Sequence, residues 1–381
     1  MVKATELKLE LIPDINEIPA RDWNALAGSN PFVNHAFLAA LETSGSVAAE
    51  TGWQPYHMCL RDEDSILVGA VPLYVKSHSY GEYVFDHAWA NAYENAGGSY
   101  YPKLQSSIPF TPVTGPRLLV KHNDAHIKSQ LLLGVAAAAE KLSISSSHLT
   151  FIEDVEAKLA EENGFLVRHA QQFHWQNDGY DTFDDFLQDL SSRKRKQIRK
   201  ERRTATENGI TIRWLQGADI TDAHWDAFFE FYLDTGARKW GQPYLNKEFF
   251  QTIGETMPES IVLFLCERDG NPIAGALNLI GGGTLYGRYW GCIEDHPCLH
   301  FEACYYQAID YAIKHRLKTV EAGAQGEHKL ARGYVPTTTY SAHWIVNEGF
   351  RDAVANFLRQ EKHQIAFEAK ILSKHTPFKK G

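Results

Sequence analysis

The stretch LFLCERDGNPIAGALNLI, residues 263–280, decides the fold of this chain, because its pattern occurs twice. Two apolar runs flank a polar turn, which predicts a β-hairpin. The stretch YHMCLRDEDSILVGAVPLYV, residues 56–75, repeats the order of apolar residues, Cys, one further residue, Arg-Asp, turn, apolar pair and Gly-Ala. Its turn is one residue longer. Each copy therefore predicts an antiparallel hairpin.

The predicted secondary-structure elements that follow the two hairpins also occur in a similar order. A strand, a helix and two strands follow the second hairpin, and an irregular stretch, a helix, a strand, a short helix and a strand follow the first. Both copies end on His-Trp, at residues 174–175 and 343–344. Matches in the same order indicate an internal duplication. We expect domains over residues 1–178 and 179–381, divided within the polar segment QNDGYDT.

The helix expected over residues 300–316 has one apolar face with i, i+3, i+4, i+7 spacing. Its residues are Phe301, Cys304, Tyr305, Ala308, Ile309, Ala312 and Ile313. Each half thus combines strands, helices and a hairpin into a mixed, mainly antiparallel sheet flanked by helices, which is an α/β (α+β) fold class.

The composition limits the class of protein. The 381 residues carry a formal net charge of −9, are 44% hydrophobic and 22% charged, and include five scattered cysteines. These values exclude a disordered chain and argue against a general nucleic-acid coat protein. An odd number of cysteines without CxxC predicts a reducing compartment. Because the start lacks a signal-peptide pattern and no run of about 18 apolar residues occurs, we expect a cytoplasmic protein without a transmembrane segment.

The order β, α, ββ, β, α, β of each half resembles the GNAT acyltransferase fold. Two tandem copies resemble the FemAB family, whose members transfer an amino acid from aminoacyl-tRNA to the peptide of a peptidoglycan precursor. The segment GEHKLARGYVP, residues 326–336, is similar to the family's aromatic-Lys-x-x-Phe-Gly pattern, with Lys329 at the family's lysine. His328 replaces the aromatic residue, and Arg-Gly-Tyr stands near the Phe-Gly. The resemblance is to the bacterial FemAB-like proteins, and it implies two tandem GNAT-like domains, the first on the acceptor side and the second on the donor side.

The segment around Lys329, residues 321–344, is dense in acids, bases and rings. Its glycines let the backbone approach a ligand at the end of a strand. We expect Lys329 to stabilise the oxyanion that forms when an amine attacks an ester or thioester carbonyl. We expect Glu321, Glu327 or His328 to accept the proton of the amine. The further predicted substrate-binding residues are Gln325, Arg332, Tyr334 and His343. The alternative is a solvated loop whose charges pair with one another.

A basic run, SSRKRKQIRKERR at residues 191–203, has eight Lys or Arg and one Glu. An apolar stripe at Leu187, Leu190 and Ile198 predicts that it is helical. We predict that it binds phosphate or tRNA through Arg195, Lys196, Arg199, Lys200, Arg202 and Arg203. The alternative is a solvated helix face.

Two aromatic segments suggest further substrate contacts. Residues 86–117 are rich in aromatic residues and proline, and they are too many for a simple connection. They predict an acceptor pocket formed by Trp89, Tyr101, Lys103 and Arg117, with an ordered Ω-like loop as the alternative. Trp240 is a predicted substrate contact that is equally suited to packing.

The expected strand at residues 284–292 is not followed by a glycine-rich phosphate loop. The junction GCIEDHPCLHFEA has no glycine after Gly291, and its two acids would repel phosphate. This counts against acetyl-CoA. The residues Cys292, Cys298, His300 and Cys304 lack the spacing of a zinc site. We expect no metal and no tightly bound cofactor.

The residues and the resemblance together predict an acyltransferase or aminoacyltransferase. It would transfer an activated group directly to an amine acceptor, such as a peptidoglycan precursor, with aminoacyl-tRNA as the donor. Two alternatives stay open: an N-acyltransferase that uses acyl-CoA or an acyl carrier, and a non-catalytic protein that binds a muramyl peptide or tRNA.

Overall fold

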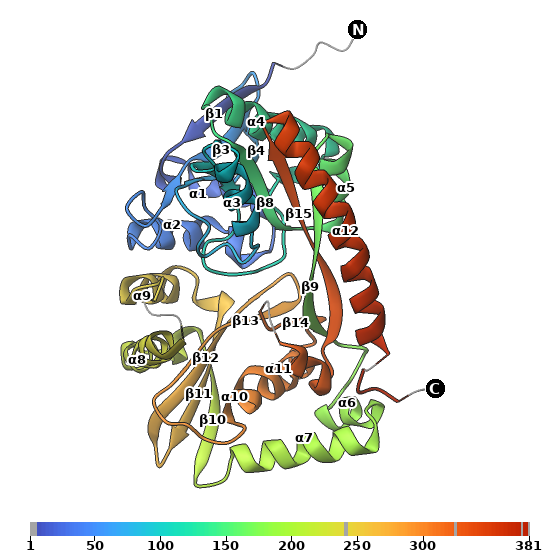
Figure 1. The fold of residues 1–381 in the computed structure, drawn as a ribbon. Coiled ribbons are helices and arrows are strands. Elements are labelled where there is room, and N and C mark those ends of the chain that lie inside the picture. The colour runs from blue at the N-terminus through green and yellow to red at the C-terminus, as the bar shows by residue number, and fades with distance from the viewer. Residues whose placement is uncertain (1–5, 240–242, 324–325, 375, 380–381) are drawn as a thin grey trace. The chain divides into compact units, whose positions relative to one another are not determined.

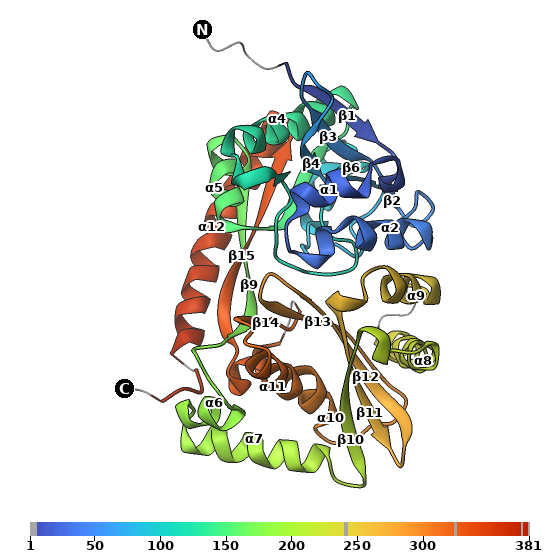
Figure 2. The same cartoon turned by 180° about the vertical axis from the view of Figure 1, so that it is seen from behind.

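The computed structural model describes residues 6–239, 243–323, 326–374 and 376–379. The chain forms two compact units, which Figures 1 and 2 show from opposite sides. The first comprises residues 1–170 and 338–367, and the second comprises residues 171–337 and 368–381. The predicted domains are residues 1–178 and 179–381. That division places residues 338–367 in the second domain, whereas in the structure they belong to the first unit. The assignment of acceptor and donor sides stays a prediction.

The first unit contains two groups of paired strands. One has the order β1–β3–β4–β7, and the other has the order β15–β8–β6–β5–β2. The strands are β1 (Lys8–Ile12), β2 (Trp53–Pro55), β3 (His57–Arg61), β4 (Leu67–Val71), β5 (Tyr74–Lys76), β6 (Lys103–Ser106), β7 (Leu119–Val120), β8 (Ser146–Ile152) and β15 (Val335–Ile345). The β6–β8 pair is parallel and the other pairs of the unit are antiparallel. The predicted hairpin of residues 56–75 is present as β3–β4.

Helices cover these strands. They are α1 (Ala20–Ala27), α2 (His35–Thr43), α3 (His87–Asn95), α4 (Ala125–Lys141), α5 (Asp154–Glu162) and α12 (Glu348–Ser373). Asp124 caps α4, because its carboxylate accepts hydrogen bonds from the first backbone N–H groups of the helix. The apolar face of α4 packs on β3, β4 and β8 around Leu131, Leu132 and Val135.

The second unit contains one group of strands, in the order β10–β11–β12–β13–β14–β9. They are β9 (Leu166–Gln176), β10 (Ile210–Gln216), β11 (Ile261–Arg268), β12 (Asn271–Gly281), β13 (Thr284–Cys292) and β14 (Thr319–Glu321). β13 and β14 are parallel and the other pairs are antiparallel. The predicted hairpin of residues 263–280 is therefore confirmed as β11–β12.

Both faces of the second sheet are covered by helices. α8 (Asp222–Lys239) and α9 (Lys247–Thr256) lie on one side of β11–β13, as Figure 1 shows. A β-carbon at Gly291 would lie 2.2 Å from the carbonyl carbon of Phe231, so only glycine lets α8 pack this closely on β13. Because β11 is covered on both sides, its run of apolar residues is continuous rather than alternating.

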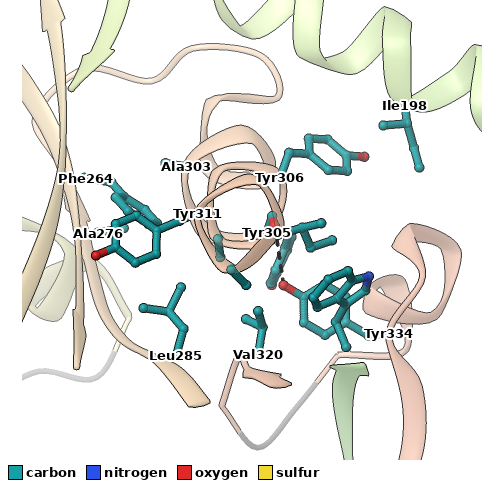
Figure 3. Close-up of a cluster of buried hydrophobic side chains, with 14 of the residues drawn as sticks. Ile198, Phe264, Ala276, Leu285, Ala303, Tyr305, Tyr306, Tyr311, Val320 and Tyr334 are labelled. Atoms are coloured by element: carbon teal, nitrogen blue, oxygen red, sulfur yellow. Dashed lines mark hydrogen bonds between the residues drawn. The ribbon is translucent and has the colours of Figure 1, made fainter. Parts of the chain in front are cut away.

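The opposite side carries the long helix predicted over residues 300–316. It is present as α10 (Leu299–Phe301), a π-helical turn (Glu302–Tyr306) and α11 (Gln307–Lys314). Behind it lie α6 (Phe183–Asp189) and α7 (Ser192–Ala205), and the second of these confirms that the basic run is helical. Figure 3 shows the core between the sheet and this helix, with Phe264, Leu285, Tyr305 and Val320 pointing inward.

The predicted fold class, mixed and mainly antiparallel sheets flanked by helices, is confirmed. Among the described residues no helix is long and apolar enough to cross a membrane.

Candidate active site

The site lies where β13 and β14 separate. The two strands pair from Thr284–Thr319 to Tyr286–Glu321, and β13 then continues to Cys292 without β14 beside it. On the other side of β13, the register with β12 shifts between Leu277 and Asn278, so that Arg288 is an extra, bulged residue. Bulges re-aim side chains beside functional sites. The end of β14 is also the carboxyl end of a parallel strand, where open sheets bind ligands.

A small pocket of about 100 Å³ opens at this separation. Its lining comes from β12, β13, α10, the π-helical turn and the residue after β14. The residues are Ala276, Leu277, Asn278, Gly287, Arg288, Tyr289, Trp290, His300, Cys304, Tyr305 and Ala322. Pockets for drug-sized ligands usually measure about 300–1,000 Å³. This pocket therefore suits a small group.

A larger and more open hollow of about 660 Å³ lies along β10. Its charged lining residues are Arg213 and Asp219, and Arg213 forms an ion pair with Glu267. None of its lining residues belongs to residues 321–344, the segment that the sequence marks as reactive.

Arg288 and Glu321 form a buried ion pair beside the pocket. The distance between Arg288 Nη2 and Glu321 Oε2 is 2.5 Å. The other carboxylate oxygen of Glu321 lies 3.8 Å from His174 Nε2, which also contacts Gln172. Burial lowers the pKa of His174, so its ring is neutral near pH 7. The guanidinium of Arg288 therefore holds the carboxylate of Glu321, and the predicted role of Glu321 as a proton acceptor stays a prediction.

Lys329 lies next to this pair, on the 3-10 turn Glu327–Arg332, and its residue is 2% exposed. Its ammonium donates a hydrogen bond to the carbonyl oxygen of Gly323 at 3.0 Å. No carboxylate within the described part of the chain pairs with it. Burial, and secondly the charge of Arg288, lower the pKa of Lys329 to about 8. The buried cluster therefore holds two cations and one carboxylate, an arrangement that favours an additional negative charge.

His328 precedes Lys329 on the same turn and is exposed. Its Nε2 lies 2.9 Å from the hydroxyl of Tyr305, which lines the pocket. Partial burial, then the charges of Arg332 and Lys329, lower the pKa of His328. Its imidazole is neutral near pH 7 and has the protonation state of a base. The turn containing Glu327 is described but its side chain is not, and Gln325 and Trp240 lie outside the described residues.

Arg332 and Tyr334 are buried inside the second unit. Arg332 donates hydrogen bonds to Glu201 at 2.9 Å and to the carbonyl oxygen of His328 at 2.8 Å, and its guanidinium lies over the ring of Phe301. Tyr334 packs against Tyr305 in the core (Figure 3). These contacts hold the turn that carries Lys329. Whether Arg332 or Tyr334 also touches substrate stays a prediction.

The sequence profile of a family described as peptidoglycan biosynthesis/recognition, FemAB-like, matches residues 14–380. The chain belongs to the FemAB-like family. This confirms the resemblance, and it supports transferase activity at the level of the family. No curated protein matches the chain.

Solved structures share the fold of this FemAB-like chain at low identity. FemX is 15% identical with a TM-score of 0.52, over 82% of this chain and 93% of that one. The C-terminal domain of a putative lysylphosphatidylglycerol synthetase from Agrobacterium fabrum is 9% identical with a TM-score of 0.54, over 92% and 96%. L-PGS from Bacillus licheniformis is 10% identical with a TM-score of 0.52, over 88% and 98%. At these identities the likeness concerns the fold alone.

The basic helix of the FemAB-like chain uses its cations in two ways. Arg202 turns inward, where it pairs with Glu302 and Asp310 and lies over Phe183. Arg199 is exposed and pairs with Asp184. The other predicted residues are Arg195, half-buried, and Lys196, Lys200 and Arg203, exposed. None of these four has an acidic partner within the described part of the chain. The helix thus retains an exposed, largely uncompensated basic face, although Arg202 does not belong to it.

The predicted acceptor residues lie in the first unit, and most of them have partners within it. Lys103 is fully buried, and its ammonium donates hydrogen bonds to Ser79, Glu82 and Asp86. The guanidinium of Arg117 is also buried and bonds the carbonyl oxygens of Val113, Gly115 and Pro116, which secures the irregular stretch 86–117.

The remaining acceptor candidates are rings. Tyr101 bonds Ser79 through its hydroxyl at 2.8 Å. Trp89 is 5% exposed and lies edge-on against His343, with 4.9 Å between the ring centres. His343 in turn bonds His148, with 2.7 Å between the two Nδ1 atoms. The structure therefore gathers these residues into buried networks of the first unit, and their contact with an acceptor stays a prediction.

Sequence reasoning missed several residues of the site, among them His174, Asn278 and Arg288. A signal was present for Arg288, because a charged residue within an apolar strand and directly after a glycine is unusual. A similar signal marked Asn278, a polar residue in the middle of the strand AGALNLI. His174 belongs to the repeated His-Trp pair, which indicated the duplication but not a site.

Proposed function

We propose that this FemAB-like chain transfers an aminoacyl group directly from aminoacyl-tRNA to an amine acceptor, such as a peptidoglycan precursor. The observation that carries the proposal is Lys329, a buried cation without a carboxylate partner in the described chain, beside a pocket that suits a small group. A buried charge is costly unless it is compensated. A negative charge that appears only during the reaction would compensate it.

The proposed reaction is an acyl transfer. The neutral amine of the acceptor attacks the ester carbonyl of the donor, a C–N bond forms, and the carbonyl oxygen becomes an oxyanion that the ammonium of Lys329 stabilises. The amine then loses a proton, for which neutral His328 is our candidate acceptor, or a group of the acceptor itself. The C–O bond breaks, the C=O bond re-forms, and the departing ribose oxygen takes up a proton.

The basic face of α7 would hold the phosphates of the tRNA. Three cations, Lys196, Lys200 and Arg203, are exposed without acidic partners among the described residues. Because like charges on one helix face repel one another, an anionic ligand such as the phosphates of tRNA would stabilise this face. The family relation to FemX and the fold shared with L-PGS are consistent with aminoacyl transfer.

The test is a transfer assay with labelled mixed aminoacyl-tRNA and peptidoglycan precursors. Wild type is compared with Lys329→Met and with Lys141→Met, an exposed lysine of α4 as the matched control. We expect Lys329→Met to lower kcat by about 10²–10³ while the affinity for aminoacyl-tRNA stays nearly constant. Lys141→Met should be unchanged. Transfer from acyl-CoA instead of aminoacyl-tRNA would establish the N-acyltransferase alternative.

A second candidate function is recognition without transfer, and the family's description, which includes recognition, favours it. A binding protein of this kind would show no turnover with any donor. Its affinity for a muramyl peptide or tRNA would then fall in Lys329→Met, which is the opposite of the result expected for a catalytic lysine.

A further inference from the structure

The side-chain oxygen of Asn278 is buried in the second unit without a hydrogen-bond partner among the described residues. The residue is 0% exposed and lines the small pocket. Its amide nitrogen donates hydrogen bonds to the carbonyl oxygens of Val262 at 3.3 Å and Ala276 at 3.0 Å. Because both partners are acceptors, the nitrogen must face them, and this fixes the oxygen on the opposite side. An unpaired buried acceptor costs about 1–3 kcal/mol.

The amide oxygen of Asn278 is aimed across Gly287 toward the end of β14. A β-carbon at Gly287 would lie 3.3 Å from Asn278 Oδ1 and 3.6 Å from the carbonyl oxygen of Glu321. The missing side chain at residue 287 thus leaves the oxygen uncovered by any β-carbon on the side of the pocket. Since Asn278 is paired with Gly287 across the β-bulge, the bulge and the glycine together create this position.

We propose that Asn278 is a specificity-determining residue that accepts a hydrogen bond from the α-amino group of the aminoacyl group being transferred. The proposal rests on the proposed function, because it concerns the donor of that reaction. A carboxamide oxygen can only accept a hydrogen bond, so the matching ligand atom must carry hydrogen. An aminoacyl group carries such an atom, the amino nitrogen, on its α-carbon, whereas a simple acyl group such as propanoyl carries only hydrogen in its place.

The donor suits this position better than the acceptor amine does. The pocket holds only a small group, and the transferred group must stay in the site throughout the reaction. The acceptor amine must be free to move onto the carbonyl and needs its lone pair for the attack. The rings of Tyr289, Trp290 and Tyr305 also line the pocket, and the face of an aromatic ring attracts an amino group more than a carboxylate.

The experiment compares two stable donor analogues that differ only in the α-amino group, 3′-(alanylamino)-3′-deoxyadenosine and 3′-(propanoylamino)-3′-deoxyadenosine. Dissociation constants are measured by calorimetry with the full chain. We expect wild type to bind the alanyl compound more tightly, by about tenfold, because the propanoyl compound leaves the oxygen of Asn278 unpaired. Asn278→Leu should abolish this preference.

Gly287→Ala is the second variant, and it decides the matter if Asn278→Leu does not fold. Its methyl group would occupy the space next to Asn278 Oδ1 and leave the amide with its two carbonyl partners, so the preference should again be lost. The matched controls are Asn271→Leu, at the exposed start of the same strand, and Gly349→Ala, outside the pocket, and both should keep the preference.

The outcomes separate this proposal from the proposed function. Binding of both analogues by wild type without preference, or a preference retained in Asn278→Leu and Gly287→Ala, overturns the role of Asn278 and leaves aminoacyl transfer standing. If wild type binds neither analogue but transfers from aminoacyl-tRNA, the role of Asn278 as a donor contact is also overturned. If wild type neither binds them nor transfers, both proposals fail.

Discussion

Arg288 and Glu321 form a buried ion pair, with 2.5 Å between Nη2 and Oε2, at the point where β13 and β14 separate. The two residues are 33 positions apart in the chain. They are joined because the helix of residues 299–314 returns the chain to a parallel strand beside β13. The pair places a compensated charge next to Lys329, whose own charge has no carboxylate in the described chain.

Removing the carboxylate of this pair should be strongly destabilising. Glu321→Gln leaves the buried guanidinium of Arg288 without its counter-charge, and we expect a loss of about 3–5 kcal/mol in the free energy of unfolding. Urea denaturation at pH 7 measures it. The double variant Arg288→Met/Glu321→Leu should recover most of the stability but not the activity. Equal instability of single and double variants would contradict an electrostatic cause.

Lys329 should make the stability of the chain depend on alkaline pH. Its pKa of about 8 in the folded state lies below the value of about 10.4 in the unfolded state, so the unfolded chain binds more protons between these two values. The cost of burying the charge is full below pH 8 and disappears as the pH rises toward 10. The free energy of unfolding of Lys329→Met should therefore be higher than that of wild type by up to about 3 kcal/mol at pH 7.

The measurement is urea denaturation of both proteins at pH 7 and pH 9.5, where the difference should shrink. Lys141→Met should show no pH-dependent difference from wild type. A constant difference at both pH values would mean that the effect of Lys329→Met comes from packing and not from charge.

The buried pair His148 and His343 should make the protein sensitive to acid. Burial lowers the pKa of His148 to about 3 and lowers the pKa of His343 well below its usual value. The charge of Lys103 lowers both pKa values further, and the charge of Arg168 also lowers the pKa of His343. The carboxylate of Asp86 raises both pKa values and so opposes the shift. The unfolded chain takes up these protons near pH 6.5 and the folded chain does not. Stability is therefore full above pH 6.5 and falls toward pH 3, by up to about 2.7 kcal/mol per pH unit for two protons.

Denaturation of wild type and of His148→Leu/His343→Phe between pH 7 and pH 4.5 tests this. The double variant should lose the steep part of the dependence, whereas His126→Gln, at an exposed histidine, should retain it. An unchanged slope in the double variant would assign acid sensitivity to other groups.

The exposed face of α7 should control the salt dependence of tRNA binding. In the test variant, Ala replaces Lys196, Lys200 and Arg203 together. We expect weaker tRNA binding and a slope of log Kd against log salt that is smaller by about 2–3, because each lost phosphate contact contributes roughly 0.7–0.9 to the slope. The control changes three exposed lysines elsewhere, Lys141, Lys362 and Lys374. If both triple variants lower the slope equally, general charge and not this face is responsible.

Local sequence was sufficient for the elements that depend on neighbouring residues. The hairpins β3–β4 and β11–β12, the helix after β13 and the helical basic run α7 all follow from periodicity and turn chemistry. The orientation of α7 did not follow, because Arg202 is turned inward by two partners at least 100 residues away, Glu302 and Asp310. The π-helical turn at residues 302–306 shifts the buried face and brings Glu302 and Tyr306 inward, which an ideal helical period does not predict.

The sequence by itself determined the fold class, the duplicated hairpins and the segment that carries Lys329, because periodic apolar patterns and glycine positions are local properties of the chain. Only the tertiary structure decided which charges are buried, which are paired and which face a pocket. Lys103 and Lys329 both appeared in the sequence as candidate site lysines, yet the fold gives Lys103 two carboxylates and gives Lys329 a carbonyl oxygen. The reason is physical: the state of a buried charge is set by its distance to other charges and by the loss of water, and chain folding fixes both.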